Sequence, residues 1–249
     1  MKLLTAPTAN PKVAKNDKKG VLTAPLHLAP ADLSGHNVCP MASAGCKAAC
    51  LHTAGNPLYM AGKQRARIAR THLYFSDRAS FMLQLHREIE AHMRKAKRMR
   101  MKPGIRLNAT SDIPWHRVAY VGPDGRKWAN VMAAFPRVAF YDYTKRTPRK
   151  GDIIPPNYHL TFSLAEDNDK AAQDALLRGV NVAVVFDTKR GQPLPTHFMG
   201  QPVLDGDDHD FRPADGRYAV GVIVGLRAKG QAIGDRSGFV RHAASAHLT

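Results

Sequence analysis

The chain has 249 residues, of which 37 are Lys or Arg and 20 are Asp or Glu, so its formal net charge is +17. A chain of this length can bury a sizeable core, and a field this positive attracts polyanions, which predicts DNA as a partner. The longest aliphatic run, residues 180–186, is too short to span a bilayer, and no apolar leader follows Met1. We therefore expect a cytoplasmic protein that does not associate with membranes.

Residues 1–19 are polar and rich in lysine, and they predict a basic N-terminal arm that is either solvated or in contact with a phosphate backbone. Residues 20–249 are expected to form a single catalytic domain, because nothing in them resembles a linker. The apolar residues 21–28 predict its first strand.

All three cysteines follow this strand, within residues 36–52, HNVCPMASAGCKAACLH. Clustered thiols favour one local site over a disulfide framework, and thiolates bind zinc or an iron–sulfur cluster. The spacing C-x6-C-x3-C matches neither a zinc ribbon nor the radical-SAM motif, so the metal stays open. The alternative is that the cysteines only pack in a loop rich in Ala and Gly. The expected metal ligands are Cys39, Cys46, Cys50 and His52.

Two helices are predicted next, the first over residues 58–72. Ser76 and Asp77 supply capping oxygens for the second, which extends to about Arg100. Its apolar residues recur every four positions and predict a buried stripe of Phe81, Leu85, Ile89, Met93 and Ala96. The other face carries charges of a single sign, which fit either a solvated face or a phosphate-facing surface. These are Arg87, Arg94, Lys95, Lys97, Arg98, Arg100 and Lys102.

From Pro103 onward, short β-type runs alternate with helical or loop segments. A short helix is expected at 128–135, and a longer one should run from an Asn168 cap to Leu177 and end at Gly179. The strands are predicted at 105–109, 137–141, 158–162, 181–186, 202–204 and 220–226. This alternation predicts an α/β fold of parallel β-α-β units, in a compact and partly closed TIM-like barrel.

Polar side chains follow several of these strands, and in a parallel sheet they would share one rim with the cysteine loop. Two carboxyl groups there could divide acid/base work, or one could attack a sugar carbon. Polar strand ends also serve as caps and turns. The chain has no P-loop, G-x-G-x-x-G or G-x-S-x-G motif. The candidate catalytic residues are Asp112, Asp142 and Asp205, and the candidate substrate-binding residues are Asn108, Ser111, Tyr141, Lys145, Ser163 and Glu166.

Five blocks occur in order between about residues 20 and 240: HLAPADLSGHNVCPMASAGCKAACLHTAGN, RLNATSDIPW, FPRVAFYDYTK, YHLTFSLAEDND and NVAVVF. They resemble bacteriophage DNA guanine transglycosylases of the DpdA type, distant relatives of the tRNA-guanine transglycosylases. The resemblance implies a TIM-barrel glycosyltransferase in the host cytoplasm that exchanges guanine in DNA for a free 7-deazaguanine base such as preQ0. The zinc signature that the tRNA enzymes carry near their C-terminus is missing here.

The resemblance also implies an aspartate nucleophile and a second aspartate that acts as acid/base. Asp112 is the first choice for acid/base or base-contacting work, and Asp142 or Asp205 for the nucleophile. Asn108, Ser111 and Lys145 would hold the base or a phosphate. Two alternatives stay open: an iron–sulfur, radical-SAM-like enzyme that modifies nucleic acid, and a metal-stapled DNA-binding protein without catalysis. The oligomeric state is open as well.

Overall fold

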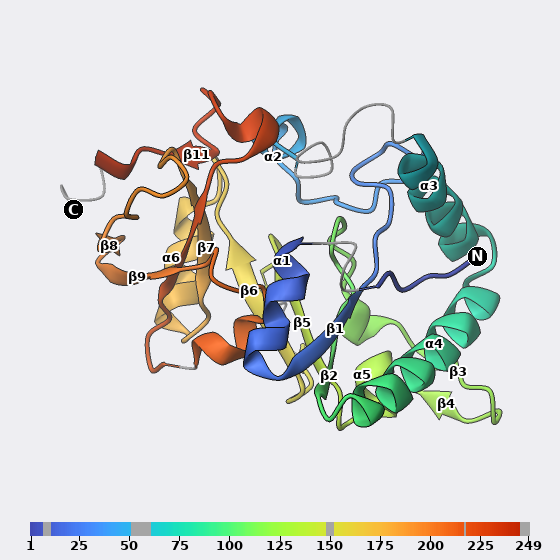
Figure 1. The fold of residues 1–249 in the computed structure, drawn as a ribbon. Helices are drawn as coiled ribbons and strands as arrows, with labels where there is room; N and C mark the ends of the chain where they lie inside the picture. Colours follow the sequence, from blue (N-terminus) through green and yellow to red (C-terminus); the bar gives the residue numbers. More distant parts are fainter. Residues whose placement is uncertain (7–10, 51–60, 148–151, 217, 245–249) are drawn as a thin grey trace. The chain divides into compact units, whose positions relative to one another are not determined.

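The computed structural model describes residues 1–6, 11–50, 61–147, 152–216 and 218–244 (Figure 1). Its strand β1 (Val21–Pro25) is buried along its whole length. It pairs in parallel with β2 (Lys102–Arg106), and β2 pairs in parallel with β5 (Ala139–Thr144). A strand that is buried on both faces has a nearly continuous apolar sequence instead of an alternating one, and in β1 only Thr23 interrupts that run.

The chain divides into two compact units. The first comprises Met1–Pro40, Met60–Asp142 and Pro148–His159. The second comprises Met41–Tyr59, Tyr143–Thr147 and Leu160–Thr249. Residues 20–249, predicted as a single domain, thus contribute to both units.

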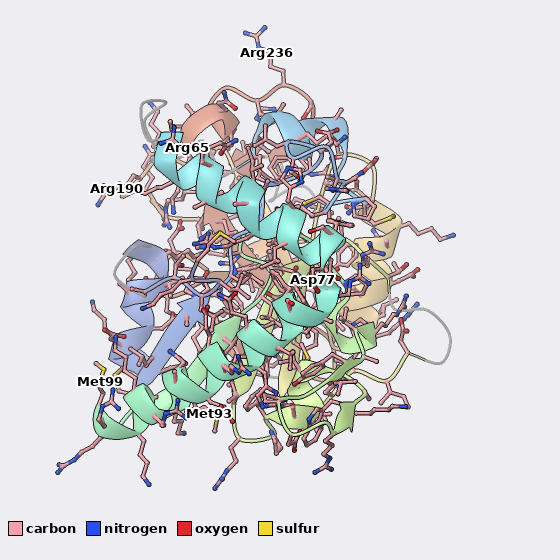
Figure 2. All side chains as sticks on the ribbon, turned by 90° about the vertical axis from the view of Figure 1, so that its right-hand side faces the viewer. Arg65, Asp77, Met93, Met99, Arg190 and Arg236 are labelled. Carbon is pink, nitrogen blue, oxygen red and sulfur yellow. The ribbon has the colours of Figure 1, made fainter. Side chains whose placement is uncertain are left out.

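In the first unit, helices α3 (Ala61–Ser76) and α4 (Arg78–Arg98) follow each other, and α4 packs against β1 and β2. The predicted cap is confirmed: the Asp77 carboxylate accepts a hydrogen bond from the Ser80 N–H at 2.9 Å, and Figure 2 shows Asp77 between the two helices. The buried stripe of α4 includes His92, while Met93 is only partly buried. A helix has 3.6 residues per turn, so positions spaced by exactly four residues drift away from its buried side. This drift explains why His92 is buried and Met93 only partly so.

The described parts of residues 1–19 belong to the first unit. They include α1 (Pro11–Ala14) and the 3-10 helix η2 (Lys15–Lys19). Leu3, Val13 and Asn16 are fully buried, and the Asn16 amide donates to the hydroxyl oxygens of Thr23 and Tyr141 at 3.0 and 2.9 Å. The lysines of η2 stay exposed.

The rest of the first unit consists of short elements. A 3-10 helix, η3 (Trp115–Arg117), leads into an antiparallel hairpin of β3 (Tyr120–Val121) and β4 (Lys127–Trp128). The helix predicted at 128–135 is shorter, α5 (Val131–Ala134). The reason is that Trp128 pairs with Tyr120 and Asn130 caps the helix by accepting from the Ala133 N–H at 2.9 Å.

In the second unit, β6 (Tyr158–Ser163), β7 (Val182–Phe186), β10 (Ile223–Arg227) and β9 (Gln201–Asp205) pair in parallel in this order. Strand β11 (Val240–Arg241) also pairs in parallel with β7, and β8 (His197–Phe198) pairs antiparallel with β9. Helix α6 (Asp169–Leu177) adds Ala172 and Leu176 to the core of this sheet. The remaining short helices are α2 (Ala44–Ala48), η4 (Arg212–Asp215) and η5 (Gly230–Ala232).

These pairings confirm the α/β class and the mostly parallel sheet. Within each unit the strand order is open, so the closed, TIM-like part of the prediction is not confirmed by the residues that the structure describes. In the same part of the chain, no helix combines the length and the apolar character that a bilayer crossing requires.

Candidate active site

Asp142, near the carboxyl end of β5, is a fully buried carboxyl group. Its Oδ1 accepts a hydrogen bond from the backbone N–H of Asn108 at 2.6 Å, and its Oδ2 accepts one from the Tyr158 hydroxyl at 2.8 Å. Arg106 and Asp112 are close enough to act on it electrostatically. Both carboxyl oxygens of Asp142 are therefore held in place by hydrogen bonds.

Burial raises the pKa of Asp142 from 3.8 to about 7, because a carboxylate that leaves water loses solvation that its neutral form hardly needs. The hydrogen bonds from Asn108 and Tyr158 and the charge of Arg106 oppose this rise, while the charge of Asp112 adds to it. Burial also raises the pKa of Tyr158 well above its usual value, so that its hydroxyl keeps the proton that it donates. A carboxyl group that titrates near pH 7 suits general acid/base work.

The side chain of Asn108 shapes the loop that follows β2. Its Oδ1 accepts three hydrogen bonds, from the Ser111 hydroxyl at 2.8 Å, the Ile113 N–H at 3.0 Å and the Trp115 indole N–H at 2.9 Å. Its Nδ2 donates to the Ile113 carbonyl at 2.9 Å. Because these contacts all fold the loop back on itself, the amide fixes the segment that carries Asp112.

Asp112 lies in this loop with 9% of its surface exposed. Its backbone N–H donates to the Val38 carbonyl at 2.9 Å, and the Thr110 hydroxyl donates to the Leu28 carbonyl at 2.6 Å. The segments that follow β1 and β2 are thus joined at the carboxyl ends of their strands. The structure brings Asn108, Asp112 and Asp142 together there, as expected for strand ends of a parallel sheet.

Tyr141, expected to contact substrate, is fully buried and accepts the hydrogen bond from Asn16. Tyr158 and Arg106, which the sequence interpretation missed, contact or face Asp142 instead. Tyr158 lies 16 positions from Asp142. The only signal that could have indicated it is its place at the start of the next predicted strand.

Two of the expected substrate-binding residues meet in the second unit. The Lys145 ammonium donates to the Ser163 hydroxyl oxygen at 2.9 Å, and its Nζ lies 5.5 Å from the centre of the Phe239 ring. This pair places a cation and a hydroxyl group at the end of β6.

Glu166 holds the start of α2. Its carboxylate accepts from the Ser43 hydroxyl and from the Gly45 N–H, both at 2.6 Å, and the Ser43 hydroxyl oxygen accepts from the Cys46 N–H at 3.2 Å. These contacts fix the start of α2, which carries Cys46, to Glu166 in the segment that follows β6. Although burial acts the other way, they lower the pKa of Glu166 and keep it ionised.

A methyl group at Gly45 is expected to disturb this arrangement. The Cβ of Gly45→Ala would clash with Ser237 Oγ and lie 2.9 Å from both Glu166 oxygens. We expect a loss of about 1–3 kcal/mol in the free energy of unfolding, measured by denaturant titration. Gly62→Ala is the control, because nothing lies within 4 Å of its added Cβ in α3, and it should be neutral or stabilise by up to about 1 kcal/mol. Equal stabilities of the two variants would contradict the tight packing at Gly45.

Asp205, the third catalytic candidate, lies in the second unit at the end of β9. Its carboxylate oxygens accept from Arg227 Nη1 at 3.0 and 2.9 Å, and the same nitrogen lies 3.2 Å from Asp207 Oδ2. Lys229 contacts the other oxygen of Asp207 at 2.6 Å. Asp205 is exposed and paired with Arg227, whereas Asp142 is fully buried.

The cysteines lie in different units: Cys39 in the first, Cys46 and Cys50 in the second. The Cys39 Sγ accepts from the Ala31 N–H at 3.5 Å and donates to the Thr110 carbonyl at 3.8 Å. Cys46 packs against a small apolar cluster. His52 lies outside the described residues, within which no three His, Cys, Asp or Glu side chains form a group that could hold a metal ion. The zinc or iron–sulfur site stays a prediction.

The model of a protein family described as gene product 88 matches residues 2–243, which is nearly the whole chain. No curated protein and no solved structure matches it. The chain therefore belongs to the gene product 88 family.

Proposed function

We propose that this protein is a DNA-modifying enzyme that exchanges guanine for a free 7-deazaguanine base, with Asp112 and Asp142 as its working carboxyl groups. The observation that supports this most is the buried Asp142, which has a pKa of about 7. Asp142 lies near a second carboxyl group, that of Asp112, at the carboxyl ends of β2 and β5. The net charge of +17 suits a polyanionic substrate. The resemblance of the blocks around these residues to phage transglycosylases supplies the reaction.

The geometry favours a division of roles in which Asp112 meets the substrate. Asp112 retains some exposure, whereas Asp142 is fully buried and both its oxygens accept hydrogen bonds. Two neighbouring carboxyl groups tend to share one negative charge. We therefore assign Asp112 as the nucleophile and Asp142, which burial keeps protonated up to about pH 7, as its neighbour; this exchanges the roles that the resemblance implied. Asp142 is a positioning residue in this scheme.

The proposed exchange has two steps. The Asp112 carboxylate attacks C1′ of the nucleotide, the C1′–N9 bond breaks, and its electron pair leaves with guanine, which takes up a proton. The 7-deazaguanine then loses its N9 proton and attacks C1′, and the carboxylate is released. One proton is taken up and one is given back, so no net acid or base is consumed.

Incorporation of radiolabelled guanine into duplex DNA tests this function without knowledge of the modified base. We expect the wild-type protein to incorporate label, and preQ0 to appear as a deoxynucleoside after digestion and mass spectrometry. Asp112→Asn should abolish both, and Asp142→Asn should remove an inflection near pH 7 from the rate profile. The control is Asp124→Asn, an exposed turn residue of the same unit. Incorporation that is equal in wild type and Asp112→Asn would overturn the proposal.

A DNA-binding protein without catalysis is the second candidate, because the net charge alone would support it. It predicts salt-sensitive binding of DNA by Asp112→Asn with wild-type affinity, and no label incorporated by any variant. Neither candidate uses a metal in any step, and neither needs a closed barrel, since the strand ends that carry Asp112 and Asp142 come from β2 and β5 alone.

A further inference from the structure

We propose that the exposed side of α4, together with the residues beside its C-terminal end, is a separate surface that binds the phosphate backbone of a nucleic acid. We call this surface the basic face. It consists of Arg87, Arg94, Lys95 and Arg98 on α4, with Lys19 and Lys102 next to the end of the helix. The proposal takes its partner from the proposed function, but it needs no chemistry at Asp112 or Asp142.

The helical period places the α4 cations on one side. Arg94, Lys95 and Arg98 follow Arg87 by seven, eight and eleven positions, which brings them onto the face opposite Phe81, Leu85 and Ile89. All four cations are exposed, and so is the small Ala91 between them. Eleven residues of helix span about 16 Å, a length that covers two or three phosphates of one strand. Figure 2 looks onto this helix, with Met93 and Met99 marking its C-terminal half.

Backbone hydrogen bonds bring the other two lysines to the end of α4. The Met101 N–H donates to the Ala96 carbonyl at 3.0 Å, which turns the chain sharply after the helix. The Lys102 N–H then donates to the Gly20 carbonyl at 2.9 Å, next to Lys19. Both lysine side chains are exposed. The positive charge thus continues from α4 onto η2 without a break in the first unit.

The charge of the basic face is not neutralised within the described residues, where none of its six cations forms an ion pair with a carboxylate. Of the nearby acids, Glu88 accepts from the backbone N–H groups of Leu3 and Leu4, and the partly exposed Glu90 lies 3.7 Å from His86. Cations in the last turn also stabilise a helix through its dipole. That effect applies to Lys95 and Arg98 in α4 and to Lys19 in η2, but it does not extend to Arg87 and Arg94, which lie before the last turn of α4.

The basic face and the candidate active site lie at opposite ends of the sheet in the first unit. Lys102 is the first residue of β2 and pairs with Val21, whereas Asn108 and Asp112 follow the last residue of β2. Five strand residues separate the two ends by about 16 Å. The basic face would therefore contact phosphates away from the reacting nucleotide, and it should add affinity without reading sequence or changing the chemical step.

The double variant Arg94→Gln/Arg98→Gln tests the basic face by fluorescence anisotropy with a labelled duplex of random sequence. Each phosphate contact contributes nearly one unit to the slope of log K against log salt. At about 0.1 M salt we expect affinity to fall at least about tenfold, and the slope to become shallower by about two. Lys127→Gln/Arg137→Gln removes two exposed cations of the same unit and should leave affinity and slope unchanged. Wild-type affinity and slope in Arg94→Gln/Arg98→Gln would overturn the proposal.

Two further measurements make the result specific. Arg94→Lys/Arg98→Lys keeps the charges and should restore the slope, and a thermal melt of each variant shows whether it is folded. DNA and RNA duplexes should both bind through the basic face, because both present phosphates; binding of neither would contradict it. The test does not depend on base exchange. If exchange is observed, Arg94→Gln/Arg98→Gln should raise KM for DNA and leave kcat and the pH profile unchanged.

Discussion

The Asp142→Asn variant is expected to gain stability over the wild-type protein as the pH rises from 4 to 7. In the folded protein Asp142 keeps its proton up to about pH 7, whereas in the unfolded chain it loses that proton near pH 3.8. Between these values the folded state binds more protons, so wild-type stability falls as the pH rises. The full difference corresponds to about 4 kcal/mol, and it is reached above pH 7. The amide of the variant has no such titration.

The measurement is the difference in free energy of unfolding between variant and wild type, from denaturant titrations at several pH values. Burial lowers the pKa of His86 and of His92, which makes the protein less stable as the pH falls. Because both proteins contain these histidines, their effect cancels in the difference. A difference that stays flat between pH 4 and 7 would show that Asp142 is not held as a buried acid.

Asp77→Asn serves as a control of opposite sign. A hydrogen bond from Ser80 lowers the pKa of Asp77, so its ionised form contributes stability that is present above pH 3.8 and is lost as the pH falls through the lower, folded pKa. Relative to wild type, Asp77→Asn should therefore lose stability as the pH rises in the acid range. The stability difference from wild type should therefore change with pH in opposite directions for the two variants. That result would show that the Asp142 effect arises from burial at the end of β5 and is not common to all carboxyl groups.

The sequence predicts those parts of the fold that depend on neighbours along the chain. The Asp77 cap, α4 and most strands follow from capping oxygens and apolar periodicity, and the proximity of Asp112 to Asp142 follows from the rule that parallel strands end at one edge. The ion pair of Asp205 with Arg227 joins residues of β9 and β10 that are 22 positions apart in the sequence, and no local pattern indicates it. A polar residue after a strand has the same appearance in the sequence whether it binds a substrate, holds the start of another helix as Glu166 does, or pairs with a cation.

Asn108 illustrates why the role of a site residue is harder to predict than its place. Its position after β2 indicates a side chain at the rim, and a carboxamide there could bind a base. The structure directs the amide into its own loop, because the indole N–H of Trp115 and the N–H of Ile113 are buried and need an acceptor. That requirement arises only when Trp115 is packed in the core, which depends on contacts from α3 and α4, such as those of Tyr74 and Phe81.

Asn108→Ala should therefore cause a large loss of stability, about 3–5 kcal/mol in the free energy of unfolding. The substitution leaves the N–H groups of Ile113 and Trp115 buried without an acceptor, and each such group costs about 1–3 kcal/mol. Denaturant titration measures the loss. Trp115 fluorescence, recorded in a Trp128→Phe background because the chain has two tryptophans, reports whether the loop opens before the rest of the unit.

Asn130→Ala is the matched control, since it removes the same side chain from the same unit. Asn130 caps α5 through the Ala133 N–H and donates to the His116 carbonyl at 3.1 Å, and the loss of a cap costs about 1 kcal/mol. If Asn108→Ala loses no more than this control, the amide does not organise the loop, and the position of Asp112 beside Asp142 needs another cause. If it loses more, the release of the loop also removes the Asn108 N–H from Asp142, and the pKa of Asp142 should rise further because that bond stabilises its ionised form.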